Sequence, residues 1–181
     1  LNVPRSLLTR QENHFATIAI PGVAAECYAG MTTWIEGEPL SNYLDAHSGR
    51  NERLRFFHRI GEIAATIHNQ STRWAAPRGF ERPRLDLDGL VGETPRWGRF
   101  WEHPGLTGME QDLMLRARNK LRETLNDYGR NPDTFSLIHA DLHPGNLVYD
   151  GNQLAVIDFD DSAFGWHLYE FASALIEERL T

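Results

Sequence analysis

Two stretches of the chain carry apolar residues at intervals of three and four, the spacing of an amphipathic helix. In the first stretch, which starts after Asn51, the apolar positions are Leu54, Phe57, Ile60, Ala64 and Ile67. In the second stretch, residues 109–128, they are Leu113, Ala117, Leu121, Leu125 and Tyr128. Gly129 follows directly, and glycine is common at helix ends. We therefore predict two long helices, each with one apolar face.

Shorter helical segments are predicted on either side of these two. Ser41 is a good N-cap residue for a helix that runs to about His47 and is broken by Ser48 and Gly49. A last helix is expected over residues 168–180, which carry spaced apolar residues. The larger, C-terminal part of the chain is thus predicted to be mainly helical.

The N-terminal part instead shows two runs rich in β-branched and aromatic residues, at residues 15–20 and 26–34. Pro21 and Gly22 lie between these runs and favour a turn. This pattern predicts two strands joined by a turn. Near the C-terminus, residues 162–165 are predicted to form a loop before the last helix.

A second hairpin is predicted late in the chain. Two short apolar runs, residues 147–149 and 154–157, flank the sequence Asp150-Gly151-Asn152. A glycine directly after an aspartate, between two β-prone runs, is a strong hairpin signal. In an antiparallel hairpin the open ends of both strands lie side by side.

Three oxygen-bearing side chains converge on the open end of this predicted hairpin. Asn146 enters the first strand, Asp158 leaves the second strand, and Asp141 lies on the loop just before. Carboxylate and amide oxygens are hard ligands that suit Mg²⁺, which usually takes further ligands from substrate phosphates. The sequence therefore predicts a magnesium site here.

The residues around this predicted site carry a family resemblance. His-Ala-Asp-Leu-His-Pro-Gly-Asn at residues 139–146, followed by Ile-Asp-Phe-Asp at residues 157–160, resembles the catalytic and metal loops of the aminoglycoside phosphotransferase/choline kinase family, which is related to protein kinases. In the kinase pattern an asparagine follows the catalytic aspartate by five positions, and a later Asp-Phe pair binds metal. Asn146 follows Asp141 by five positions, and Asp158 begins the Asp-Phe pair.

The resemblance implies an ATP- and Mg²⁺-dependent phosphotransferase. Such an enzyme moves the γ-phosphoryl group of ATP to a hydroxyl of a small molecule, here of the aminoglycoside, amino alcohol or amino acid type. Asp141 would accept the proton of the attacking hydroxyl, while Asn146 and Asp158 would hold Mg²⁺ on the nucleotide phosphates. Asp160 and Asp161 favour a cationic acceptor, although ordinary surface acidity explains these two carboxylates as well.

The resemblance also implies an α+β, protein-kinase-like fold with a mainly helical C-terminal lobe and a partial N-terminal β-lobe. Residues 1–38 would supply the strands and the hinge, and residues 39–181 would form the catalytic lobe, truncated at its C-terminus. Backbone groups of the hinge would hydrogen-bond the adenine of ATP. The hinge residues are Thr32, Thr33, Trp34 and Ile35.

Three further residues are candidates for supporting roles. The resemblance implies that His143 contacts a nucleotide phosphate or a metal-bound water, and that Glu170 hydrogen-bonds the catalytic loop and holds its shape. A first-turn glutamate favoured by the helix dipole explains Glu170 equally well. His68 lies beside the apolar face of its helix, where a packed, hydrogen-bonded histidine is the favoured interpretation.

The composition narrows the class of protein further. A chain of 181 residues is expected to form one domain with a sizeable core. A net charge of −7 argues against binding nucleic acid through its phosphates. Cys27 is the single cysteine and cannot form an internal disulfide, so a reducing, cytoplasmic compartment is expected. Membrane partners are not expected, because no stretch approaches a membrane span.

Two parts of a kinase-like fold are not recognised in the sequence: a glycine-rich loop over the phosphates and the lysine of the third strand. The only lysine is Lys120, in a predicted helix. We therefore expect a fragment that lacks the start of the nucleotide lobe and is inactive by itself. A divergent protein that has lost the lid is the alternative. Apolar surfaces exposed by truncation would favour self-association.

Two other classes of protein fit parts of this pattern. A metal-dependent hydrolase would use His139, Asp141, His143 and Asp158 as ligands of zinc or manganese. A non-catalytic nucleotide-binding protein of kinase ancestry is favoured by the missing lysine, but the intact Asp141, Asn146 and Asp158 speak against it. Consumption of ATP, or its binding without turnover, distinguishes these classes.

Overall fold

The computed structural model of the chain describes residues 1–47 and 49–176. Ser48, one of the predicted helix breakers, and the end of the helix predicted over residues 168–180 lie outside the described residues. Contacts between residues divide the chain into two compact units. Unit 1 comprises Leu1–Arg53 and Pro144–Asp158, and unit 2 comprises Leu54–His143 and Phe159–Thr181.

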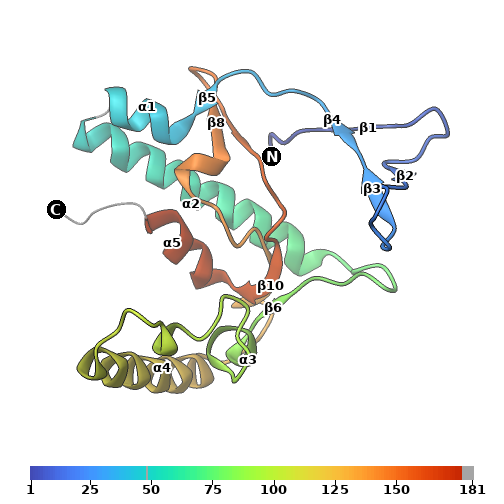
Figure 1. Cartoon of the computed structure of the whole chain (residues 1–181). Helices are drawn as coiled ribbons and strands as arrows, with labels where there is room; N and C mark the ends of the chain where they lie inside the picture. The colour runs from blue at the N-terminus through green and yellow to red at the C-terminus, as the bar shows by residue number, and fades with distance from the viewer. Residues whose placement is uncertain (48, 177–181) are drawn as a thin grey trace. The chain divides into compact units, whose positions relative to one another are not determined.

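Unit 1 begins with two pairs of short antiparallel strands (Figure 1). β2 (Ala16–Ile18) pairs with β3 (Cys27–Ala29), which confirms the predicted pair of strands joined by a turn. The second predicted run continues into β4 (Met31–Thr32), which pairs with β1 (Ser6–Leu7) instead. That run is therefore two strands with different partners.

The rest of unit 1 is a three-stranded antiparallel sheet with one helix beside it. The strand order is β5-β8-β9, with β5 at Glu38–Pro39, β8 at Leu147–Tyr149 and β9 at Leu154–Val156. Helix α1 (Leu40–His47) follows β5 directly and buries Leu40 and Leu44. The predicted late hairpin is confirmed, and a strand from much earlier in the chain completes its sheet.

Helix α1 begins two residues earlier than an N-cap at Ser41 would allow. Leu40 is its first residue, so Ser41 lies inside the helix and the prediction that it caps the helix is wrong. Pro39 comes directly before the helix and pairs with Val148 as the last residue of β5. Proline has no N–H to donate to a neighbouring strand. An edge strand such as β5 tolerates it, because one side of the strand has no partner in the sheet.

Unit 2 is built from a small mixed sheet and several helices. The sheet has β10 (Ala163–Trp166) in the middle, parallel to β6 (Arg84–Leu85) and antiparallel to β7 (Phe135–Ile138). The helices are α2 (Arg50–Arg73), whose first residues belong to unit 1, α3 (Leu87–Val91), α4 (Gly108–Tyr128) and α5 (His167–Leu175). Figure 1 shows β6 beside β10, directly before α5.

Strand β10 corrects the sequence analysis, which predicted a loop over residues 162–165. Ala163, Gly165 and Trp166 are buried. Gly165 packs so closely on β7 that a Cβ built on it would lie 2.7 Å from Cδ1 of Ile138. A short strand that is covered on both faces has no alternating pattern, and for that reason the sequence did not reveal it.

The apolar face predicted for α2 is only partly the one that is buried. Ile60, Ala64 and Ile67 are buried as predicted. Phe56 is also buried, whereas Leu54 is 59% exposed, so the prediction for the first turn is wrong. Phe56 lies one full helical repeat before Ile60, at the i and i+4 spacing that places residues on one face, and Leu54 does not.

The apolar face predicted for α4 is not buried in the described structure, where this helix has no buried residue. Leu113 and Leu121 are 52% and 40% exposed. The helix is held to the preceding segment by Arg118, whose guanidinium donates to the carbonyl oxygen of Val91 at 2.9 Å and lies 4.0 Å from the centre of the Trp101 ring. Charged side chains thus make contacts that the sequence analysis assigned to the leucines.

Gly37, shortly before β5, adopts a backbone conformation that favours glycine. Its φ is 133°, and a Cβ built on it would lie 2.5 Å from the carbonyl oxygen of Tyr149. We expect Gly37→Ala to lower the free energy of unfolding by roughly 1–3 kcal/mol, the usual cost of a strained backbone residue. Urea unfolding measures this effect. Gly61→Ala in α2 is the matched control, because nothing lies within 4 Å of a Cβ there and alanine favours a helix. Equal stability of Gly37→Ala and the unchanged chain would contradict the close approach.

Two expectations about location and lobes stay predictions. None of the helices in residues 1–47 and 49–176 is long and apolar enough to cross a membrane. The cytoplasmic location predicted from the single cysteine, Cys27, stays a prediction. The lobe boundary predicted between residues 38 and 39 differs from the division into units, because unit 1 also includes α1 and the late hairpin.

Candidate active site

The hairpin of unit 1 brings the predicted metal ligands Asn146 and Asp158 to neighbouring positions. Leu147 at the start of β8 lies opposite Val156 at the end of β9. One step further out, the Ile157 N–H donates to the carbonyl oxygen of Asn146 at 3.0 Å. Asn146 directly precedes β8 and Asp158 lies two residues after β9, so both residues flank the open end of the hairpin.

The turn at the other end of the hairpin fixes this register. The Asp150 Oδ1 accepts from the backbone N–H groups of Asn152 and Gln153, at 2.8 and 2.6 Å. Gly151 has a φ of 93°, which a side chain would strain. The Asp-Gly signal in the sequence thus corresponds to a real turn, and this turn determines which residues meet at the open end.

Two residues of the predicted loops hold backbone conformations that are uncommon outside glycine. Asp158 has a φ of 60° and Ala140 has a φ of 70°. Positive φ values at such residues tend to cluster at functional sites, where the surrounding structure enforces them. Asp158 lies two residues after the end of β9, and Ala140 directly precedes Asp141.

The predicted catalytic base Asp141 belongs to unit 2, together with both histidines of its loop. The His143 Nε2 lies 3.5 Å from the Asp141 Oδ2, and the His143 N–H donates to the Asp141 carbonyl oxygen at 3.0 Å. The Asp141 N–H in turn donates to the Nδ1 of His139 at 3.3 Å. His139 is fully buried, with its ring centre 4.6 Å from that of Phe159. His139 therefore supports the loop, and His143 lies beside the Asp141 carboxylate.

Glu170, on the first turn of α5, holds the backbone just before Asp141. The Ala140 N–H donates to the Glu170 Oε1 at 2.6 Å, and the His139 amide also bonds this carboxyl group. The side chain is 1% exposed, and its Oε2 has no hydrogen-bond partner among the described residues. Burial raises the pKa of Glu170 to about 7, while the two amides oppose the rise. Glu170 thus contacts the catalytic loop, as the resemblance implied.

The raised pKa of Glu170 makes stability depend on pH in a defined direction. The folded chain keeps this carboxyl protonated up to pH 7, whereas the unfolded chain loses the proton near its ordinary pKa of 4.5. Between these values the folded state binds more protons, so the stability contributed by Glu170 falls as pH rises, by roughly 3 kcal/mol in total. Glu170→Gln, which stays neutral, should remove this part of the pH dependence.

The measurement is the free energy of unfolding of both proteins at several pH values between 4.5 and 8. Glu123→Gln on exposed α4 is the matched control and should leave the profile unchanged, because this side chain is 69% exposed. An identical pH profile for Glu170→Gln and the unchanged chain would contradict the assignment.

The hinge residues lie in unit 1, at and after β4. Thr32 pairs with Ser6 across the β1-β4 ladder. The Thr33 N–H donates to the carbonyl oxygen of Arg5 at 2.9 Å, and its Oγ1 accepts from the Arg5 N–H at 3.0 Å. Trp34 is 82% exposed. The segment is thus anchored through Thr33, directly before the exposed tryptophan.

Within the described residues, the predicted site residues fall into two groups, one in each unit. Asn146 and Asp158 flank the open end of the hairpin in unit 1, where Asn146 bonds the neighbouring Ile157, and Asp141 contacts His143 in unit 2. No group of three or more His, Cys, Asp or Glu side chains in residues 1–47 and 49–176 is arranged to hold a metal ion. Lys120 lies on α4, 3.8 Å from Glu123 and well exposed.

Comparison with known proteins decides the family. A model of the phosphotransferase enzyme family matches residues 1–180. The chain belongs to this phosphotransferase family. Among curated proteins, the amicoumacin kinase of Bacillus subtilis (strain 168) is 29% identical over 66 residues, which are 36% of this chain and 20% of that protein.

Two solved structures of kinases resemble this phosphotransferase-family chain over 97% of its length. The microcompartment-associated aminopropanol kinase has 32% identity and a TM-score of 0.79, with 52% of its own chain covered. The amicoumacin kinase hAmiN, solved with AMP-PNP, Ca²⁺ and Ami, has 16% identity and a TM-score of 0.68, with 47% covered. The predicted α+β, kinase-like fold is confirmed. The chain spans about half the length of these two proteins.

Tyr169 was not predicted from the sequence of this phosphotransferase-family chain. Its hydroxyl accepts a hydrogen bond from the Trp97 Nε1 at 3.0 Å. Burial raises the pKa of Tyr169, and the carboxylates of Asp141, Asp161 and Glu170 add to the rise. The phenol thus lies within electrostatic range of the predicted base. No periodic pattern or motif in the sequence indicates Tyr169, because its neighbours depend on how α5 packs.

Proposed function

We propose that this chain carries the catalytic part of an ATP- and Mg²⁺-dependent phosphotransferase that acts on a hydroxyl of a small molecule. The observation that supports the proposal is the hairpin whose open end is flanked by Asn146 and Asp158. Asn146 also follows Asp141 by five positions in the sequence. Family membership supports the same class. Such chemistry relies on positioning and charge neutralisation, so a preformed arrangement of ligands is its main requirement.

Asn146 and Asp158 would hold the magnesium ion. Their side chains offer an amide oxygen and a carboxylate, the hard ligands that Mg²⁺ takes in combination with water and phosphate oxygens. A site with two protein ligands fits this chemistry, because the substrate phosphates complete the coordination. When bound, the ion neutralises the negative charge that develops on the phosphates.

Asp141 would accept the proton of the acceptor hydroxyl. The Asp141 carboxylate lies beside His143. The Glu170 carboxyl group accepts from the Ala140 N–H and so fixes the backbone directly before Asp141. Both contacts restrict where the carboxylate can point, which a general base requires. His143 would sit between this base and a nucleotide phosphate or a metal-bound water.

Adenine recognition would use backbone groups of the hinge. The Thr33 N–H already donates to the carbonyl oxygen of Arg5, so Thr33 would contact adenine through its carbonyl oxygen, and further contacts would come from Thr32, Trp34 and Ile35. Thr33 would also fix the position of the segment, through the hydrogen bonds of its side chain and its backbone N–H to Arg5.

The acceptor would be a small amino alcohol. The solved structure with 32% identity is an aminopropanol kinase. The carboxylates of Asp141 and Asp161 both lie within electrostatic range of Tyr169, whose hydroxyl accepts a hydrogen bond from the Trp97 Nε1. A carboxylate and aromatic rings near the base suit an ammonium group.

The test uses the natural protein as it is encoded, with ATP, magnesium and a panel of alcohols. We expect 1-amino-2-propanol and ethanolamine to gain one phosphoryl group by mass spectrometry, and 2-propanol, which lacks the amine, to react far less. Release of inorganic phosphate without modified acceptor would support the hydrolase instead. ATP binding without any consumption would support a non-catalytic protein.

A further inference from the structure

Unit 2 has a second concave site, formed by the end of α2, the strands β6, β7 and β10, and the segment after α4. This open pocket has a volume of about 370 Å³, and none of residues 139–143 line it. The volume lies within the usual range for small-molecule sites, roughly 300–1,000 Å³. Neither the proposed reaction nor the family comparison gives this pocket a role.

Two arginines give one side of the pocket an excess of positive charge. The Arg84 Nε and the Arg130 guanidinium both lie against the same carboxylate oxygen of Asp86, at 3.2 and 3.0 Å. Burial alone would raise the pKa of Asp86, but the hydrogen bond from the Gly89 N–H and then the two arginines hold it below its ordinary value. One carboxylate cannot neutralise two guanidinium groups, so one positive charge is left over in a chain whose net charge is −7.

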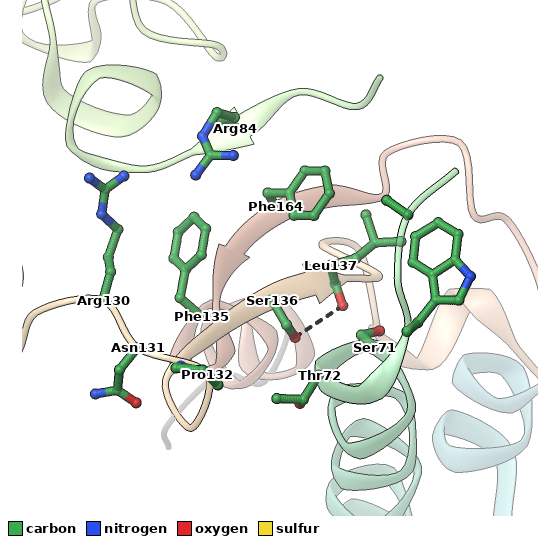
Figure 2. A pocket seen from close by; sticks show the side chains of 12 residues that line it. Ser71, Thr72, Arg84, Arg130, Asn131, Pro132, Phe135, Ser136, Leu137 and Phe164 are labelled. Carbon is green, nitrogen blue, oxygen red and sulfur yellow. Dashed lines mark hydrogen bonds between the residues drawn. The ribbon is translucent and has the colours of Figure 1, made fainter. Parts of the chain in front are cut away.

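The same two arginines stand over aromatic rings. The Arg84 guanidinium lies 5.3 Å from the centre of Phe135 and 5.5 Å from that of Phe164, and the Arg130 guanidinium lies 5.7 Å from Phe135. Figure 2 shows both guanidinium groups beside the Phe135 ring. These contacts hold both cations in place while their side chains remain 53% and 51% exposed to solvent.

The lining of the pocket also offers an aromatic ring and hydroxyl groups. Trp74 lines the pocket, is 41% exposed, and stands edge-on to Phe80 with the ring centres 4.9 Å apart. Ser71 and Thr72, near the end of α2, also line it. A flat ring and a fixed pair of guanidinium groups in the lining of one pocket favour a flat ligand with one charged end.

We propose that this pocket binds a small aromatic anion, a molecule with a planar ring and a carboxylate or phosphate group. The ring lies against Trp74 and Phe164, and the anionic group bonds Arg84 and Arg130. Binding of this kind does not depend on the proposed phosphotransferase activity, because no residue of the predicted active site lines the pocket.

The test is direct binding of phenyl phosphate and of benzoate to the purified protein at low salt, followed by calorimetry or ligand-observed NMR. We expect at least one of the two to bind. Inorganic phosphate, which lacks the ring, and benzyl alcohol, which lacks the anionic group, should bind at least about tenfold more weakly. Arg84→Gln and Arg130→Gln should each weaken binding at least about tenfold, as expected for loss of a charge-assisted hydrogen bond.

Arg116→Gln is the matched control, because this exposed arginine on α4 does not line the pocket. Ser71→Glu provides a variant that keeps both arginines and adds a negative charge to the pocket, and it should also weaken binding. Asp158→Asn should leave binding unchanged, which separates this pocket from the nucleotide site. The proposal is overturned if neither anion binds, if inorganic phosphate binds as tightly, or if Arg84→Gln and Arg116→Gln behave alike.

Discussion

Asp141→Asn should lower the turnover of the natural enzyme by roughly 10²–10⁴-fold, the usual contribution of a general base. The asparagine keeps the shape of the side chain and its place beside His143, but it cannot accept the proton of the acceptor hydroxyl. The interaction that is lost exists only in the transition state, so kcat should fall while KM for ATP changes little. Steady-state kinetics with 1-amino-2-propanol and saturating magnesium measures both constants.

Asp112→Asn on α4 is the matched control for this loss of a carboxylate. Asp112 is exposed and lies outside residues 139–146, so its replacement should leave both constants unchanged. If Asp141→Asn keeps the turnover of the unchanged enzyme, Asp141 is not the base.

Asp158→Asn should raise the magnesium concentration needed for half-maximal rate by more than about tenfold. Loss of a residue that merely orients a metal ligand typically costs 10–100-fold in metal affinity, and Asp158 is assigned as a direct ligand. The residues of β9, Leu154–Val156, are apolar and offer no side-chain oxygen that could replace it. A magnesium titration of the rate at saturating ATP and acceptor gives the shift.

The same hairpin provides the control for this prediction. Asp150→Asn keeps the Oδ1 that accepts from Asn152 and Gln153 at the turn, so it removes a charge without disturbing the register. Its magnesium dependence should match that of the unchanged enzyme. A shift for Asp150→Asn as large as that for Asp158→Asn would mean that the effect is general electrostatics and not coordination.

The parts of the site that depend on local chain geometry were predictable from the sequence. Asp150 and Gly151 specify a tight turn, and a tight turn fixes which residues face each other across the hairpin. For that reason the hairpin, and the places of Asn146 and Asp158 at its open end, follow from sequence alone. The pairing of β5 with β8 does not follow, because it joins segments more than a hundred positions apart whose strands are only two and three residues long.

The parts that depend on tertiary packing were predicted less well. Strand β10 was missed because it is buried without alternation, and the exposed leucines of α4 show that a periodic pattern does not by itself say which face is covered. Tyr169 and the pocket at Arg84 and Arg130 arise from side chains far apart in the sequence. Glu170 was identified only through the family resemblance, since a first-turn glutamate is common in helices of every kind.

The division of roles between Asp141 and Asp158 is the central claim, and equilibrium binding of ATP tests it without any turnover. The affinity for ATP is measured with and without magnesium for the natural protein, Asp141→Asn and Asp158→Asn. We predict that magnesium strengthens ATP binding to the natural protein and to Asp141→Asn alike, and that Asp158→Asn loses this strengthening. Loss of the magnesium effect in Asp141→Asn, with Asp158→Asn unaffected, would contradict the account.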